Sequence, residues 1–426
     1  MKSPYKWDNY SDQPALLQDK SYKKKMRKKE VFSLIKTFVI ALFILPLSIV
    51  AMPFVKRKQV KSSDFFCLGI DYQREPELTL ELLEELGVDR VLVRLKLWEM
   101  QSLEDLKVFL ESLKQKKTTL KIMQDRENVE NLELLRNNLQ NIFTTLDGLI
   151  DIYEIGTTIN RSKWGFFSVD EYNNFYKVAY DLKQEKFSNI KLMGSSVIDF
   201  EYHFTAHTLF NLFKYKYDAV ASLLYVDRRG APENTQLGFS LSDKIALLST
   251  LVWLAPKTNH ELHITETNYP LSNTVPYAPT SEYECINEEE YANFMLRYYL
   301  LSFASQQVNS VSWHQLFARG YGLIDNIDGI RYTPAFTTYK YMVKNLKHSQ
   351  FLRLDIKRGY YILQFLVQEQ LVQVHWSLKE TTLKNEDYFE CFTRDGDPIL
   401  DDDIFIGSAP VYLFIRKAEP KHVNCL

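Results

Sequence analysis

Acidic side chains directly follow several short apolar runs of this 426-residue sequence. Glu266 follows LHIT, Asp199 and Glu201 follow SSVI, and Asp227 follows SLLYV. Where parallel strands end at one edge of a sheet, such side chains converge on a single site. Converging carboxyl groups can serve as proton donor, proton acceptor or nucleophile at one bond. These acids are therefore the first candidates for catalysis.

The same strand ends also carry cationic, amide, hydroxyl and aromatic side chains. Charged groups hydrogen-bond to hydroxyls, and flat rings stack on sugar faces, so the set suits a polyhydroxylated ligand. Trp313 is expected either as a sugar platform or as part of the core. The predicted substrate-binding residues are Asp71, Arg94, Asp125, Thr158, Asn160, Tyr225, Asp227, Trp313 and His314.

Eight β-type runs alternate with amphipathic helical stretches between residues 65 and 346. This alternation predicts a parallel sheet covered by helices, and its length matches a (β/α)₈ barrel of ~250 residues. A doubly wound open sheet is the alternative, but no glycine-rich phosphate loop follows the first run. The runs are 65–72, 90–97, 119–124, 149–156, 190–194, 219–225, 261–265 and 310–314.

The pattern changes after the barrel. Strand-like runs at 360–367, 371–378, 387–393 and 411–416 follow one another with no helix between them. Residues 347–426 are therefore predicted to form a small all-β domain packed on the barrel.

An apolar segment near the N-terminus predicts a membrane anchor. Residues 37–55 contain no charged residue and are long enough to cross the ~30 Å apolar core of a bilayer. Basic runs flank the segment at 23–29 and 56–58. Because the larger run precedes it, we expect a cytoplasmic basic tail (1–30), a transmembrane signal anchor (31–55) and a linker (56–64). The barrel would then lie outside the cytoplasm, in the periplasm if the source is bacterial; a cleaved signal peptide or a soluble cytosolic enzyme is the alternative.

Charge and cysteine content exclude several classes of partner. Residues 1–61 contain 14 Lys and Arg against four Asp and Glu, whereas the remainder contains 38 against 50. A body this acidic is not expected to bind nucleic acid. The four cysteines are widely spaced, and the pair His203 and His207 lacks the adjacent Glu of a zinc protease motif. No metal or cofactor is expected.

Three segments together resemble the retaining glycoside hydrolases of clan A. LHITETNYPL (262–271) is similar to their seventh-strand nucleophile motif, and YEIGTTIN (153–160) aligns with their fourth-strand motif. VSWHQLFARGYGLIDNIDGIRYTPAF (311–336) resembles their eighth strand and the entry to the last helix. The resemblance implies a barrel in which Glu266 is the nucleophile, held ionised and oriented by Arg94 and Tyr225.

The fourth-strand segment departs from the family pattern at the acid/base position. Thr157 and Thr158 stand where the clan has Asn and Glu, and threonine cannot protonate a leaving group near neutral pH. A retaining enzyme needs a second carboxyl ~5–5.5 Å from the nucleophile. Glu201 or Asp199 is expected to supply it, whereas Glu154 is expected as a buried carboxylate paired with Arg94 or Lys96.

The sequence thus predicts a membrane-anchored glycoside hydrolase-like protein that acts on an oligosaccharide or polysaccharide of the cell envelope. The alternative is a catalytically inactive glycan-binding or scaffold protein in envelope polysaccharide assembly. Thr158 is the residue that separates the two hypotheses.

Overall fold

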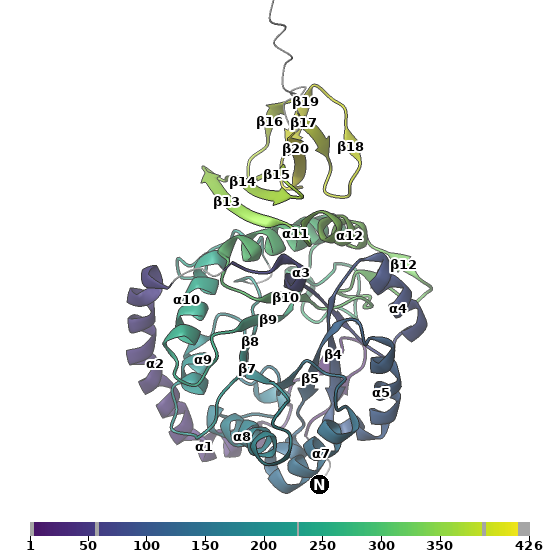
Figure 1. The fold of residues 1–426 in the computed structure, drawn as a ribbon. Helices are drawn as coiled ribbons and strands as arrows, with labels where there is room; N and C mark the ends of the chain where they lie inside the picture. Colours follow the sequence, from purple (N-terminus) through teal and green to yellow (C-terminus); the bar gives the residue numbers. More distant parts are fainter. Residues whose placement is uncertain (1–3, 56–58, 228–229, 386–388, 416–426) are drawn as a thin grey trace, which may run out of the picture.

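A closed barrel forms the centre of the molecule (Figure 1). The computed structural model describes residues 4–55, 59–227, 230–385 and 389–415. Within these residues, eight parallel strands close in the order β10-β3-β4-β5-β6-β7-β8-β9, as the sequence predicts. They are β3 (Phe66–Ile70), β4 (Arg90–Lys96), β5 (Lys117–Met123), β6 (Ile152–Ile155), β7 (Leu192–Ile198), β8 (Ala219–Leu223), β9 (Leu262–Thr267) and β10 (Ser310–Trp313).

Helices cover the outside of the barrel, so the strands are buried on both faces. Local sequence fixes where the helices begin: Asn287 and Glu290 form a reciprocal capping box at the start of α11, which satisfies two backbone donors that the first turn leaves open. The helices are α3 (Ser62–Phe65), α4 (Pro76–Glu85), α5 (Leu103–Ser112), α6 (Arg126–Glu130), α7 (Leu132–Thr145), α8 (Val169–Lys186), α9 (Tyr202–Leu209), α10 (Leu241–Leu254), α11 (Glu288–Ser305) and α12 (Pro334–Leu346).

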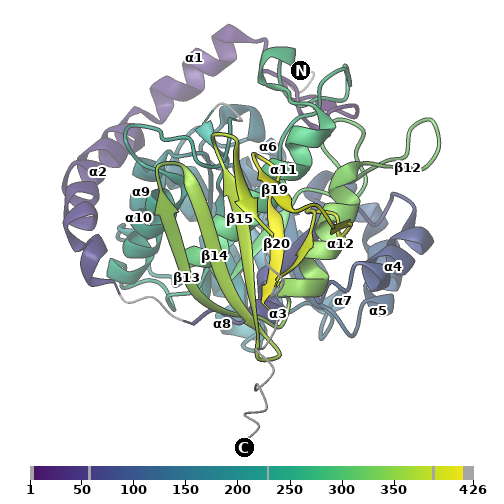
Figure 2. The same cartoon turned by 90° about the horizontal axis from the view of Figure 1, so that it is seen from above.

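A small all-β unit packs on α11 and α12 (Figures 1 and 2). In the described part it contains a six-stranded antiparallel sheet in the order β13-β14-β15-β20-β17-β18 and the pair β16-β19. Phe303 of α11 stacks on Phe365 at 5.8 Å, which joins the two cores. The start of the predicted run 387–393 and the end of 411–416 lie outside the described residues. The strands are β13 (Gln350–Lys357), β14 (Tyr360–Val367), β15 (Gln370–Ser377), β16 (Thr381–Lys384), β17 (Phe389–Phe392), β18 (Pro398–Ile399), β19 (Asp403–Ile406) and β20 (Val411–Ile415).

The apolar N-terminal segment forms helix α2 (Val31–Ala51), which a short 3₁₀ turn extends to Phe54. At 24 residues and a mean hydropathy of 2.4, Val31–Phe54 is long and apolar enough to cross a membrane, although a signal sequence meets the same criteria. The preceding helix α1 (Lys20–Lys29) is strongly basic. The second basic run, 56–58, lies outside the described residues.

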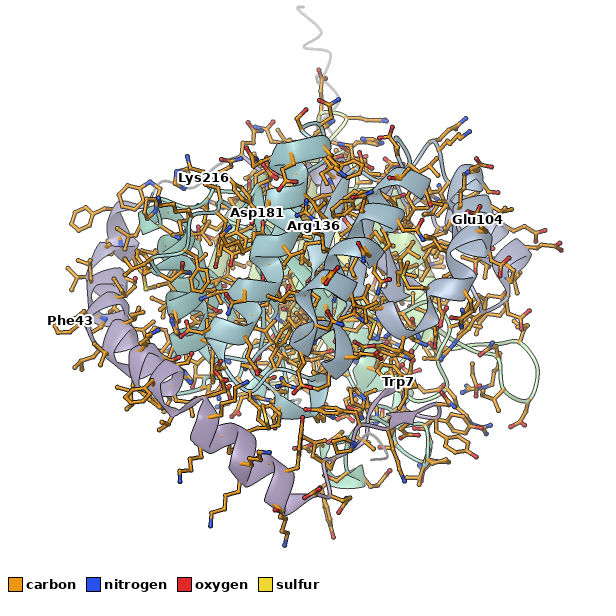
Figure 3. All side chains as sticks on the ribbon, turned by 90° about the horizontal axis from the view of Figure 1, so that it is seen from below. Trp7, Phe43, Glu104, Arg136, Asp181 and Lys216 are labelled. Carbon is orange, nitrogen blue, oxygen red and sulfur yellow. The ribbon has the colours of Figure 1, made fainter. Side chains whose placement is uncertain are left out.

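One face of α2 packs on the barrel flank beside α9 and α10 (Figure 1). The buried residues of α2 are small or polar: Ser33, Thr37, Ala41 and Ser48. Thr37 hydrogen-bonds to His207 of α9 at 2.8 Å. The opposite face is apolar and exposed, and Figure 3 shows Phe43 directed away from the barrel.

The residues before α1 lie at the end of the barrel that the C-terminal ends of the strands define. They include a two-residue hairpin, in which β1 (Trp7–Asp8) pairs with β2 (Gln13–Pro14). Gln13 accepts a hydrogen bond from Lys163 at 2.6 Å and donates one to the carbonyl of Pro279 at 2.7 Å. The sequence did not predict this contact, because residues 1–30 were expected as a tail separate from the barrel.

Candidate active site at the barrel mouth

Glu266 lies near the C-terminal end of β9 and is held from two sides. The Lys121 ammonium on β5 is 3.0 Å from its carboxylate, and the Tyr225 hydroxyl, which follows β8, donates a hydrogen bond of 2.8 Å. Burial by itself would raise the pKa of Glu266, but the Lys121 charge and these hydrogen bonds outweigh it and lower the pKa to about 2. Glu266 is therefore an ionised, oriented carboxylate with 12% of its side chain exposed.

Glu154 of β6 lies in the barrel interior and shares the Lys121 ammonium with this carboxylate. Its side chain is fully buried and accepts hydrogen bonds from Ser196 and Thr265 at 2.9 and 3.0 Å. Lys121 is 3.7 Å away, so one ammonium is shared by two carboxyl groups. Burial raises the pKa of Glu154, whereas that of Glu266 is lowered. The expected burial of Glu154 is confirmed, but its cation is Lys121 rather than Arg94 or Lys96.

Arg94 does not hold the Glu266 carboxylate in this structure. The guanidinium on β4 is almost fully buried, and its carboxylate partner among the described residues is Asp12 of the N-terminal segment. Gln315 is at 3.5 Å. The contact with Glu266 that was expected of Arg94 is made instead by Lys121 of the adjacent strand β5. The Tyr225 hydroxyl makes the contact with Glu266 that was expected of it.

The two expected acid/base candidates lie in a neighbouring cleft of about 390 Å³, onto which Tyr225 also opens. Arg161 binds both of them, at 2.7 Å from Asp199 and 2.6 Å from Glu201. Asn160 donates a further hydrogen bond to Glu201 at 2.7 Å. About a third of each acidic side chain is exposed, so both can meet a ligand from solvent.

Thr158 is buried and has a left-handed backbone, with φ of +49°, which a β-branched residue rarely adopts. Its hydroxyl lies 3.4 Å from that of Thr157. No carboxyl group stands at this position. The acid/base function must therefore come from another residue if hydrolysis occurs.

The remaining predicted binding residues have different surroundings. Asp125 caps α6 by accepting from the backbone N–H of Asn128 at 2.7 Å, and Asp71 pairs with Arg74 at 3.2 Å. Asp227 lines the cleft beside Tyr225.

Trp313 is part of the core. Its indole N–H donates to the Tyr291 hydroxyl at 2.6 Å, and neighbouring tyrosines cover the fully buried ring. It has no exposed face on which a sugar could stack. His314, the next residue, stacks on Tyr321 at 5.4 Å, and burial lowers its pKa to about 3, so it is neutral at physiological pH.

Several residues of this site were not singled out from the sequence. Lys121 had a signal, because a lysine stands between Leu120 and Ile122 in a predicted buried strand. Trp98, which follows β4, lies at the mouth. Arg74 and Asp12 had no local signal.

The described residues contain no group of three or more His, Cys, Asp or Glu arranged to hold a metal ion. His207 bonds to Thr37, and His203 stacks on Phe38. Cys67, Cys285 and Cys391 are free thiols, and Cys425 lies outside the described residues.

Solved structures of glycoside hydrolases share this fold. A family 39 glycoside hydrolase from Bacteroides cellulosilyticus WH2 superposes with a TM-score of 0.64 at 12% identity, over 84% of this chain and 82% of that one. A family 39 β-xylosidase from Caulobacter crescentus gives 0.57 at 11% identity, over 85% and 98%. A family 30 endoxylanase from Clostridium papyrosolvens C71 gives 0.55 at 9% identity, over 85% and 97%.

At these identities the likeness establishes the fold alone. No protein-family model matches the sequence, and no curated protein matches it.

Proposed function

We propose that this protein is a retaining glycoside hydrolase that acts on an extracytoplasmic glycan. The observation that carries the proposal is Glu266, an ionised carboxylate fixed by Lys121 and Tyr225 at the mouth of a barrel with the clan A fold. In the first step its oxygen attacks the anomeric carbon and the glycosidic oxygen leaves with a proton. In the second step water displaces Glu266 and restores the anomeric configuration.

The proton of the first step would come from Glu201 or Asp199. Both side chains line the same cleft as Tyr225, and both are exposed enough to reach a leaving group. Arg161 binds both carboxylates in the absence of substrate. A bound sugar would therefore have to displace Arg161 from one of them before that acid can carry a proton.

The stereochemistry of the product tests the proposal directly. Purified protein is incubated with a panel of aryl glycosides that release nitrophenolate, and the first-formed sugar is followed by proton NMR. Release of sugar with the anomeric configuration of the substrate supports retention. Inverted product would contradict the role of Glu266 as nucleophile.

Glu201→Gln should show whether Glu201 protonates the leaving group. Aryl glycosides with good leaving groups need little protonation, so their kcat/KM should change by less than about 3-fold, whereas general acid catalysis contributes ~10²–10⁴-fold on unactivated sugars. The measurement is kcat/KM on a nitrophenyl glycoside and on the matching oligosaccharide. Glu284→Gln, which alters another acid of the same cleft, is the control. Equal losses on both substrates would exclude Glu201 as the acid.

The second candidate function is a catalytically silent glycan-binding or scaffold protein of envelope polysaccharide assembly. The observation that favours it is that a threonine, Thr158, stands where a retaining enzyme would carry its acid/base carboxyl group. Binding of an oligosaccharide by calorimetry, with no turnover of either substrate class, would establish this function and exclude the first.

We also propose that α2 attaches the protein to a membrane as a single-pass anchor, with the N-terminus in the cytoplasm and the barrel outside. In that arrangement α2 has to leave α9 and α10, because its packed face would be surrounded by lipid. A reporter fused to the C-terminus should be active only outside the cytoplasm, and the protein should resist carbonate extraction. Replacing Phe38, Leu42 and Phe43 with Lys should release it, whereas three Lys substitutions on exposed positions of α5 should not. Carbonate-soluble wild-type protein would contradict the anchor.

A further inference from the structure

The N-terminal hairpin occupies the barrel mouth with two side chains. Trp7 lies between Trp98 and Trp164, with ring centroids 5.1 and 5.9 Å away. Five residues further on, the side chain of Asp12 is only 3% exposed between two guanidinium groups. Figure 3 shows Trp7 at the same end of the molecule as α1. The N-terminal hairpin thus contacts two sites at the barrel mouth, an aromatic position formed by Trp98 and Trp164 and a cationic position formed by Arg74 and Arg94.

The cationic position belongs to the barrel, not to the hairpin. Arg94 comes from β4, and Arg74, 3.5 Å from Asp12, follows β3. Both bind the same carboxylate oxygen. Burial opposes ionisation of Asp12, but the two guanidinium groups outweigh it and hold its pKa well below the ordinary value.

Arg94 needs an anion for a physical reason. Among the described residues its other side-chain hydrogen-bond partner is the neutral Gln315. Glu266 does not neutralise Arg94, because its carboxylate is paired with Lys121. A buried guanidinium without a counter-ion is strongly unfavourable. When Asp12 leaves the mouth, Arg94 therefore requires another anion, and a carboxylate would fit the position that Asp12 occupied. The positive charge of Arg74 is already partly compensated, because Arg74 also forms an ion pair with Asp71.

This cationic position adjoins the proposed nucleophile. Arg94 of β4 is the register partner of Lys121 on the neighbouring strand β5, and the Lys121 ammonium is 3.0 Å from Glu266. A sugar whose anomeric carbon met Glu266 could therefore place a substituent against Arg94, and a neighbouring sugar ring could lie on Trp98 and Trp164.

We propose that the glycan bound by this barrel carries a carboxylate, as a hexuronic acid does, and that Arg94 and Arg74 bind that group. Asp12 and Trp7 stand in the positions of the carboxylate and of a sugar ring, so the hairpin of residues 5–15 competes with the glycan as long as α2 is packed on the barrel and not inserted in a membrane. This inference rests on the glycan-directed function proposed above and names its substrate class.

Two single substitutions open the mouth in different ways. Asp12→Asn removes the competing charge but keeps the shape of the side chain. Trp7→Ala releases the aromatic contact and leaves every charged group in place. Because a ligand's apparent affinity is reduced by the fraction of protein that is closed, each substitution should tighten binding of an acidic glycan, by ~10-fold if the hairpin covers nine-tenths of the molecules. Phe405→Ala, which removes an exposed aromatic side chain on β19 of the C-terminal unit, is the matched aromatic control and should change affinity little.

The probes are glucuronate, galacturonate and mannuronate oligosaccharides, each paired with its carboxyl-reduced neutral form, titrated calorimetrically into the full chain. For at least one pair, the opened variants should bind the acidic member at least ~10-fold more tightly, since ionised partners form the stronger hydrogen bonds. Adding Arg94→Gln to Trp7→Ala should abolish that preference. Thermal unfolding shows whether each variant is folded.

The outcomes separate the two proposals. Neutral and acidic members bound equally by Trp7→Ala would overturn the carboxylate inference and leave glycan binding intact. No binding of any acidic member, together with binding or turnover of other glycosides, would overturn it in the same way. No binding and no turnover of any glycan by any variant would instead overturn the proposed function, and the substrate class with it.

Discussion

Glu266→Gln should abolish hydrolysis of aryl glycosides, with a loss of about 10⁴-fold or more in kcat, the scale seen when a covalent nucleophile is removed. The neutral amide is a poor nucleophile and loses the attraction to Lys121 that orients the carboxylate. The measurement is release of nitrophenolate under single-turnover and steady-state conditions. Because the side chains are nearly isosteric, glycan binding should persist.

Glu261→Gln is the matched control for this experiment. Glu261 immediately precedes the same strand β9 but lies at its N-terminal end, where half of its side chain is exposed and His263 is its ion-pair partner. This substitution should leave kcat unchanged. Residual activity of Glu266→Gln within 10-fold of the wild type would exclude a covalent role for Glu266.

Lys121→Met should cost about 3–5 kcal/mol of unfolding free energy at pH 7, the usual result of removing one member of a buried ion pair. Lys121 is 1% exposed and neutralises the charge of Glu266 while also facing Glu154. Without it, two buried carboxyl groups remain with no cation between them. Urea unfolding followed by circular dichroism measures the loss.

The pH dependence of this loss has a defined sign. In the wild type the pKa of Glu266 is lowered to about 2 from 4.5, so its stabilising contribution is present above pH 4.5 and disappears as the pH falls through 2. In Lys121→Met, burial should raise the pKa above 4.5, and the variant should lose stability as the pH rises. The difference between the two proteins should therefore be small near pH 2 and largest at neutral pH.

Lys117→Met is the control on the same strand. Its ammonium pairs with Asp64 at 2.6 Å, but 42% of its side chain is exposed, and exposed pairs contribute about 0–1 kcal/mol. A loss of the same size in both variants would show that Lys121 acts through helix or strand packing and not through the buried charges.

The barrel could be predicted from the sequence because parallel strands buried on both faces produce short apolar runs that helices separate. All eight runs correspond to observed strands. The boundary of β7 was misplaced, since it continues to Ile198 through Ser195 and Ser196, which have φ of +78° and +40°. The register shifts there, so the alternation that identifies a strand is interrupted.

The site was only partly predictable. Glu266 and Tyr225 could be identified from the sequence because each lies at the C-terminal end of a recognisable apolar run. Lys121 was missed because a lysine inside an apolar strand identifies neither its facing nor its partner, which is 145 residues away. The pairing of Asp12 with Arg94 joins residues 82 apart through tertiary packing alone, and no local pattern carries that information.

The packing of α2 links two equilibria that would otherwise be independent. Its small, polar face fits the barrel flank and its outer face fits lipid, while the hairpin that covers the mouth lies on the same continuous chain. If insertion of α2 carries residues 5–15 away from the mouth, lipid and acidic glycan favour the same conformation and become positive allosteric effectors of each other. Thermodynamic reciprocity then requires that the factor by which a bilayer tightens glycan binding equals the factor by which the glycan tightens bilayer binding. The protein would acquire its ligand mainly where it is anchored.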